Sequence, residues 1–195
     1  MSFITPEIIA RAKTHYDEGR AYHNWSHIEA LYVLFHEYFT LVNDPDVFEA
    51  ILVLHDVIYD SRRNDNEERS AELAVEWLSG VAMPAQLVAL AKGIVATARH
   101  IVPQDVSKPV ASDIALFCDM DLSILGSDEV TFKRYDDAIR EEYSWVSEDQ
   151  WREGRGAVLE RFLLRPAIFT TPALRERFET PARRNLQTAI EALRR

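Results

Sequence analysis

The sequence contains little glycine, a single cysteine and a large excess of acidic over basic residues. Six glycines among 195 residues, with no convincing alternation of apolar and polar residues, argue against β-strands and predict a chain that is helical nearly throughout. Cys118 cannot form an internal disulfide and lies in an apolar run, so we expect a buried free thiol, which suits a reducing compartment. The formal net charge of −10 argues against binding of a long nucleic acid, although a small cluster of arginines could still bind a phosphate.

Signals for export and for membrane insertion are also missing. The N-terminal residues show no basic stretch followed by an apolar core, and no window approaches the roughly 18 apolar residues of a membrane-spanning helix. We therefore expect a cytoplasmic protein that binds no membrane. With 47% hydrophobic residues the chain is long enough for one buried core, and we expect a single domain over residues 1–195. The sequence leaves open whether the chain forms a homo-oligomer.

Helical periodicity and capping residues divide the chain into nine expected helices. Asp44 followed by Pro45 is typical of a helix start, and Ser147 followed by Gln150 forms a capping box. The expected ranges are about 6–16, 24–41, 45–58, 67–78, 84–100, 110–122, 128–143 and 147–164, followed by a tail that Pro166, Pro172 and Pro181 break up before a last helix with Leu186, Ile190 and Leu193. This pattern predicts an all-α fold, a compact helical bundle.

The most informative stretch covers residues 52–59, where His55 and Asp56 stand side by side in an otherwise apolar run. An ionised aspartate in such a segment costs several kcal/mol unless it has a partner, and a neutral imidazole also needs hydrogen bonds. A divalent cation would satisfy both side chains. For an isolated His-Asp pair, an internal hydrogen-bond network is the alternative, so the metal interpretation depends on further ligands elsewhere.

Two other motifs supply such ligands. Residues 20–28 read RAYHNWSHI and place His27 on the inward face of an expected helix, and residues 118–126 read CDMDLSILG, with Asp121 at the end of another helix. This order of a histidine, a His-Asp pair and a distant aspartate followed by Leu-Ser resembles the HD superfamily of metal-dependent phosphohydrolases. The YHNxxH motif is also similar to the metal-site motif of cyclic-nucleotide phosphodiesterases, and the whole set looks like a small bacterial branch of predicted HD phosphohydrolases.

By this resemblance His27, His55, Asp56 and Asp121 would bind the metal, in a motif core of about 20–126 on which the helices of 127–195 pack. Two imidazoles and two carboxylates suit Mn, Fe, Co, Ni, Zn or, less well, Mg. The implied activity is hydrolysis of a phosphate ester of a nucleotide or another small molecule through metal-activated water, with Asp56 counted among the catalytic residues. Asp119, two residues before Asp121, is expected to point elsewhere and to cap or support the site.

The resemblance also implies a role for His23, one turn before His27. The matching histidine of the phosphodiesterases resembles a general acid that protonates the leaving oxygen, which suits an imidazole at neutral pH. A histidine that only caps the helix start is the alternative. Where those enzymes carry another histidine, four residues after His55, this sequence has Tyr59, so we expect one ion rather than two.

The candidates for contact with the substrate come from the motifs and from well-patterned helices. Arg140 and Arg155 could meet a phosphate, with surface ion pairs as the alternative, and the glycines on either side of Arg155 would permit close approach of a backbone or ligand. His100 could serve the substrate pocket or a second metal, and the carboxylate of Glu67 could support the metal ligands from behind. The full set of expected substrate contacts is Arg20, Asn24, Tyr59, Glu67, His100, Arg140 and Arg155.

Two other functions stay open. One is an oxygenase of the same superfamily, which would need two irons and has only His100 and either Asp119 or Glu67 to spare as further ligands. The other is a ligand-sensing or interaction module that keeps the metal only for folding. The sequence identifies neither the exact substrate nor the native metal.

Overall fold

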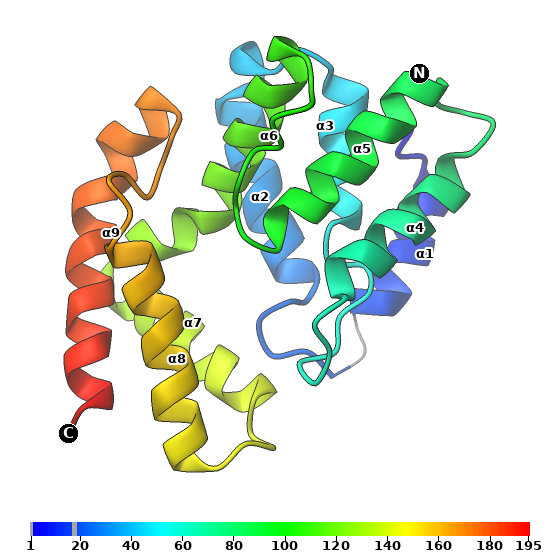
Figure 1. Ribbon diagram of the computed structural model, residues 1–195. Coiled ribbons are helices and arrows are strands. Elements are labelled where there is room, and N and C mark those ends of the chain that lie inside the picture. The colour runs from blue at the N-terminus through cyan, green and yellow to red at the C-terminus, as the bar shows by residue number, and fades with distance from the viewer. Residues whose placement is uncertain (1, 17–18) are drawn as a thin grey trace. The chain divides into compact units, whose positions relative to one another are not determined.

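The computed structural model describes residues 2–16 and 19–195, and in this part of the chain every regular element is a helix (Figure 1). The predicted all-α fold class is therefore confirmed. None of the described helices is long and apolar enough to cross a membrane. The helices are α1 (Pro6–Tyr16), α2 (Trp25–Glu37), η1 (Phe39–Leu41), α3 (Pro45–Leu54), α4 (Asn66–Leu78), α5 (Pro84–Thr97), α6 (Lys108–Asp121), η2 (Leu122–Gly126), α7 (Glu129–Glu142), α8 (Glu148–Leu163) and α9 (Pro172–Leu193), where η marks a 3₁₀-helix.

The chain forms two compact units, Met1–Cys118 and Asp119–Arg195. The first unit contains α1 to α5 and most of α6, and the second contains η2 and α7 to α9. Helix α6 runs without interruption from Lys108 to Asp121 and so carries the chain from one unit into the other. A single domain over residues 1–195 stays a prediction.

Helix α3 is the central helix of the first unit, because it contacts α1, α2, α4 and α5. Its start is capped as the sequence predicts: Oδ1 of Asp44 accepts a hydrogen bond from the backbone N–H of Val47 at 3.2 Å, and Pro45 occupies the first turn. Asp113 of α6 accepts hydrogen bonds from the backbone N–H groups of Asn43 and Asp44, both at 2.9 Å. Because α3 is surrounded by other helices, the residues that follow its last turn, His55 and Asp56, are buried in the interior.

A close approach of α5 to α3 depends on Gly93. A Cβ atom at this position would lie 2.3 Å from Cδ1 of Ile51, which is shorter than any normal contact between carbon atoms. Glycine therefore allows α5 to pack directly against the middle of α3, one turn before the helix ends. The packing of Gly93 against Ile51 therefore helps to set the position of α3 relative to α5.

The second unit is built on α9, which packs against α8 and η2. Asn185 of α9 donates hydrogen bonds to the carbonyl oxygens of Leu125 and Ser127, both at 2.9 Å. The carboxylate of Asp119 accepts hydrogen bonds from the backbone N–H groups of Thr170, at 2.8 Å and 3.0 Å, and of Thr171, just before the start of α9. Asp119 thus holds the backbone of the segment just before α9.

Four expected boundaries differ from the structure, and one of them is the end of α2, which lies at Glu37 rather than near residue 41. The expectation that Pro181 breaks up the tail was wrong, because α9 continues through it. An interior proline costs about 3 kcal/mol, but Phe178 on one side and Ala182 with Leu186 on the other are buried, so packing on both sides keeps the helix intact. Helix α3 ends at Leu54 rather than near residue 58, and α5 ends at Thr97 rather than near residue 100.

Candidate metal centre

His55 and Asp56 lie in the turn that follows α3, and both are buried, with 1% and 8% of their surface exposed. Nδ1 of His55 lies 3.1 Å from the carbonyl oxygen of Leu52, an atom that only accepts hydrogen bonds, so the ring proton belongs on Nδ1. Nε2 then presents a lone pair, and it lies 3.1 Å from Oδ2 of Asp56. A nitrogen lone pair and a carboxylate oxygen approach this closely without repulsion only when a proton or a cation lies near both.

His27 approaches this pair from α2. Its helix begins at Trp25 and is capped by Asn24, whose Oδ1 accepts a hydrogen bond from the backbone N–H of Ser26 at 2.9 Å. The His27 side chain is buried, and its ring centroid lies 5.4 Å from that of His55 at an interplanar angle of 65°. The two imidazoles therefore converge from different helices.

His27, His55 and Asp121 form a group that could hold a metal ion. Each offers one ligand atom, these atoms all lie within 4.8 Å of one another, and both histidines are buried. Asp121 is the last residue of α6, and one turn earlier the same helix places Phe117 5.2 Å from the ring of His55. Three of the four ligands expected from the sequence thus come together, and Asp56, the fourth, stands next to His55.

The chemistry of these donors fits a divalent cation. Two imidazoles with one or two carboxylates form a mixed nitrogen and oxygen set of the kind that first-row transition metals prefer. The hydrogen bond from Nδ1 of His55 to a backbone carbonyl is the usual way in which proteins orient a metal-binding histidine. Nε2 of His55 and Oδ2 of Asp56 lie 3.1 Å apart, so one bound ion could contact both atoms.

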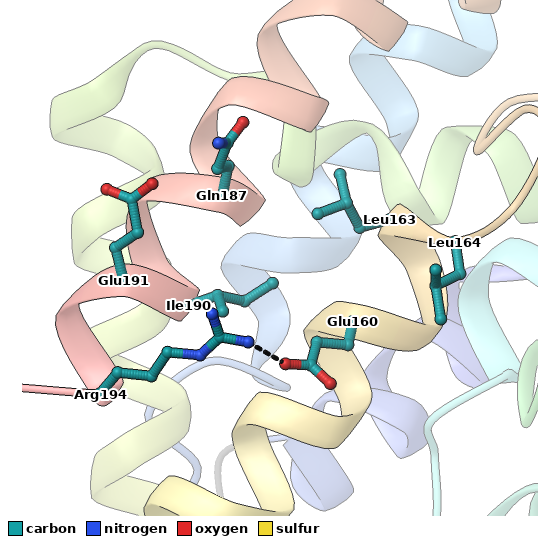
Figure 2. A pocket seen from close by; sticks show the side chains of 7 residues that line it. All are labelled: Glu160, Leu163, Leu164, Gln187, Ile190, Glu191 and Arg194. Carbon is teal, nitrogen blue, oxygen red and sulfur yellow. Dashed lines mark hydrogen bonds and ion pairs between the residues drawn. The ribbon is translucent and has the colours of Figure 1, made fainter.

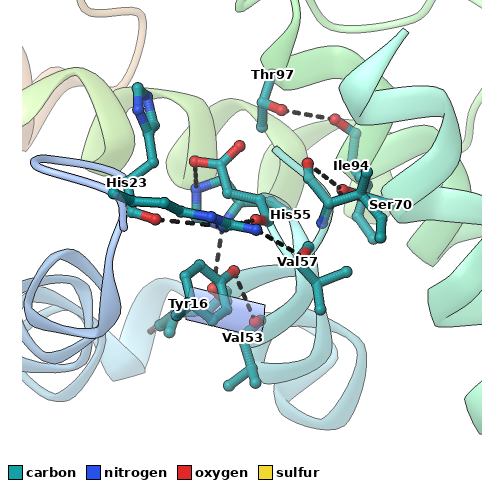
Figure 3. A network of polar contacts seen from close by, with 12 residues as sticks. Tyr16, His23, Val53, His55, Val57, Ser70, Ile94 and Thr97 are labelled. Carbon is teal, nitrogen blue, oxygen red and sulfur yellow. Dashed lines mark hydrogen bonds and ion pairs between the residues drawn. The ribbon is translucent and has the colours of Figure 1, made fainter. Parts of the chain in front are cut away.

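His23 lies beside this group, in the loop before α2, and Figure 3 shows its surroundings. Its ring stacks on Tyr59, with centroids 4.0 Å apart and planes at 26°, and Tyr22 packs edge-on against it at 5.0 Å. The ring centroids of His23 and His27 are 6.5 Å apart. The stacking on Tyr59 holds a half-buried imidazole close to the metal-binding candidates.

Glu67 and His100 lie within electrostatic range of one another and of this region. Burial raises the pKa of Glu67, and the negative charge of Asp56 raises it further. The nearby His100 lowers the same pKa by a smaller amount. His100 has a positive φ of 50°, which is uncommon for a residue other than glycine and places its side chain on a tight turn after α5. The structure therefore groups two residues that the sequence suggested for the substrate pocket.

Arg20, Asn24 and Arg140, three of the other expected substrate contacts, donate hydrogen bonds to backbone carbonyl oxygens of the protein itself. Arg20 donates to three backbone carbonyls, and the side-chain amide of Asn24 donates to the carbonyl oxygens of Arg20 and Ala21 at 3.3 Å and 2.9 Å. In the second unit, Arg140 donates to the carbonyl of Tyr143 at 2.8 Å.

Arg155 also belongs to the second unit, where its Nε donates to Oδ1 of Asp136 at 3.0 Å. A Cβ atom added at the flanking Gly154 or Gly156 would meet nothing within 4 Å, so neither glycine is required for a close approach at Arg155. Contact of Arg20, Asn24, Arg140 or Arg155 with a substrate stays a prediction.

Sequence reasoning missed several residues that shape this region. Tyr22 contacts the rings of both His23 and His27 at 5.0 Å, and Ser70 holds the turn after α3 through two hydrogen bonds with Ile58 (Figure 3). Tyr16 donates a hydrogen bond to the carbonyl oxygen of Val53 at 2.9 Å. These contacts depend on which helices meet in space, and only Tyr22 stands inside a recognisable motif.

A separate surface pocket lies in the second unit, between α8 and α9 (Figure 2). Glu160 and Arg194 form an ion pair across it at 2.7 Å. Its lining residues are Glu160, Leu163, Leu164, Gln187, Ile190, Glu191 and Arg194. None of these residues was expected to take part in the site.

Comparison with known proteins adds no family assignment. The chain gives no significant match to protein-family models, to curated proteins or to solved structures.

Proposed function

We propose that this protein is a metal-dependent phosphohydrolase of the HD type that cleaves a phosphate ester of a nucleotide or another small molecule. The observation that carries this proposal is the convergence of one ligand atom each from His27, His55 and Asp121 within 4.8 Å. The Asp56 carboxylate lies 3.1 Å from Nε2 of His55 and supplies further negative charge. These donors are the ones that the three sequence motifs nominated.

A divalent ion bound by these residues would polarise the phosphoryl oxygen and make water more acidic. The protein's own residues would do the remaining work. Burial of His27, His55 and Asp56 keeps bulk water from competing with the substrate and strengthens the electrostatic interactions at this point. His23, held against Tyr59, would donate a proton to the leaving oxygen.

The function is tested by phosphate release from a panel of nucleotides and by release of the leaving alcohol from a generic phosphodiester, in the presence of Mn²⁺, Co²⁺, Ni²⁺, Zn²⁺ or Mg²⁺. We expect metal-dependent turnover in the wild-type chain and none in His27→Ala. His36→Ala is the matched control, because His36 lies on the same helix but is exposed. It should keep full activity.

A second variant separates chemistry from metal binding. His23→Ala should keep its metal and lower kcat roughly 10²-fold to 10⁴-fold, as loss of a general acid does. The proposal is contradicted if no substrate of the panel is hydrolysed in a metal-dependent way, or if His36→Ala loses as much activity as His27→Ala.

A further inference from the structure

The side chain of Arg20 spans the two loops that carry proposed site residues. Its Nη1 donates to the carbonyl oxygen of Asp56 at 2.6 Å and to that of His23 at 3.3 Å, and its Nη2 donates to the carbonyl oxygen of Val57 at 3.1 Å. The bonds to Asp56 and Val57 cross 36 and 37 residues of sequence. One guanidinium therefore joins the loop before α2 to the turn after α3.

The turn after α3 needs such support because regular helix geometry has ended. Beyond Leu54 its backbone is held by a bond from the N–H of Val57 to the carbonyl oxygen of Leu54 at 3.3 Å, and by Ser70, which bonds both backbone groups of Ile58. Arg20 holds the same turn through the carbonyl oxygens of Asp56 and Val57. The orientation of the Asp56 side chain follows from this backbone.

Aromatic rings fix the guanidinium itself. Its central carbon lies 5.2 Å from the ring centroid of Tyr16 and 5.7 Å from that of Tyr59, and Tyr59 in turn stacks on His23 at 4.0 Å. A planar guanidinium can bond several carbonyls in one plane while its faces contact rings, whereas the ammonium group of lysine is a compact charge on a flexible stem. The three hydrogen bonds and two ring contacts of Arg20 therefore require a guanidinium, and lysine could not make all of them.

We propose that Arg20 is a positioning residue that sets the placement of Asp56 and His23, rather than a contact for the substrate phosphate; this inference rests on the proposed function of the same site. Residues that orient metal ligands typically change metal affinity 10-fold to 100-fold when they are replaced. Arg20 acts through the backbone of Asp56, and it is expected to affect metal binding before any substrate is present.

The test compares Arg20→Lys with Tyr16→Phe. Calorimetry measures the affinity of each folded chain for whichever of Mn²⁺, Co²⁺, Ni²⁺ and Zn²⁺ binds the wild type most tightly. Arg20→Lys should weaken this affinity about 10-fold or more, and lower kcat with little change in KM. Tyr16→Phe removes the hydrogen bond to Val53, so it should lower the melting temperature while leaving the metal affinity within about twofold of wild type.

Several results would overturn the inference. The inference fails if Arg20→Lys binds the metal as tightly as the wild type does. If Arg20→Lys instead raises KM and leaves kcat unchanged, Arg20 contacts the substrate phosphate. An equal loss of affinity in Tyr16→Phe would show that any weakening of the fold has this effect. If Arg20→Lys does not fold, Arg20→Gln gives the same comparison, because it keeps an N–H donor without the charge.

The metal measurement also distinguishes this inference from the proposed function. A wild-type chain that binds the metal but hydrolyses nothing would refute the phosphohydrolase, while the difference between Arg20→Lys and Tyr16→Phe would still support the positioning role. A wild-type chain that binds none of the four ions would overturn both.

Discussion

Replacement of Gly93 by alanine tests whether the contact between α5 and α3 sets the position of the candidate metal centre. The new Cβ would lie 2.3 Å from Cδ1 and 2.9 Å from Cγ1 of Ile51. The strongly preferred χ1 rotamer of a β-branched residue in a helix holds Cγ1 in place. Cδ1 can turn about χ2, but Ile51 is only 1% exposed, so its close-packed neighbours must shift to make room. His55 follows one turn later, and a shift of α3 would move its ring.

The expected cost combines two opposing effects. Overpacking of a core costs about 1–3 kcal/mol, and alanine regains about 1 kcal/mol of helix propensity relative to glycine. We therefore expect Gly93→Ala to lose up to about 2 kcal/mol of unfolding free energy in urea denaturation. Gly154→Ala is the control, because a Cβ there meets nothing within 4 Å, and it should gain about 1 kcal/mol.

A double-mutant cycle identifies the contact. Ile51→Val removes Cδ1, the atom nearest to the added Cβ, and by itself should cost about 1 kcal/mol. Gly93→Ala should also bind the metal more weakly, because the shift of α3 moves His55. In this background Ile51→Val should cost less unfolding free energy than in the wild type, or restore stability, and it should restore the metal affinity. An equal cost in both backgrounds, or a Gly93→Ala chain that is more stable than wild type, would refute the reasoning.

Three further variants test individual charges. Burial, followed by the negative charge of Asp56, raises the pKa of Glu67 above 4.5, so the fold loses stability as the pH rises from 4.5 through that raised pKa; metal-free Glu67→Gln should melt higher than wild type at pH 7 and show no advantage at pH 4. Hydrogen bonds from Thr131 lower the pKa of Asp128 below 3.8, so the stability that this helix cap provides is present above pH 3.8 and disappears as the pH falls through the lowered pKa. The difference in melting temperature between wild type and Asp128→Ala should therefore shrink in acid, and a constant difference would contradict the assignment. Arg155→Met should cost about 3 kcal/mol in urea denaturation, because it leaves the carboxylate of Asp136 without its buried partner; a loss below about 1 kcal/mol would show that the pair is dispensable.

Helix starts were predictable where a side chain marks them locally. Asp44 with Pro45 and Ser147 with Gln150 stand at the starts of α3 and α8, as expected. A cap acts within four residues of chain, so its signal is contained in the sequence.

Helix ends and interruptions were harder to predict because they depend on distant contacts. The end of α3 at Leu54 coincides with a turn that Arg20 and Ser70 hold from other parts of the chain. Pro181 continues α9 because packing outweighs its local cost. Periodicity carries no information on either effect.

In the candidate site, too, the residues of local motifs could be predicted, whereas contacts between distant segments could not. The motifs nominated His27, His55 and Asp121, and the structure brings their ligand atoms together. The sequence could not reveal that Tyr59 stacks on His23, or that Arg20 bonds the backbone of Asp56, because both contacts join segments about 36 residues apart.

Metal analysis of the purified chain tests whether the candidate centre binds an ion. We expect one divalent ion per chain in the wild type and in the exposed control His36→Ala, and none in His27→Ala or in the double variant His55→Ala with Asp56→Ala. Two irons per chain without phosphate release would favour an oxygenase. A wild-type chain that binds no metal, or variants that bind as much as the wild type, would contradict the account.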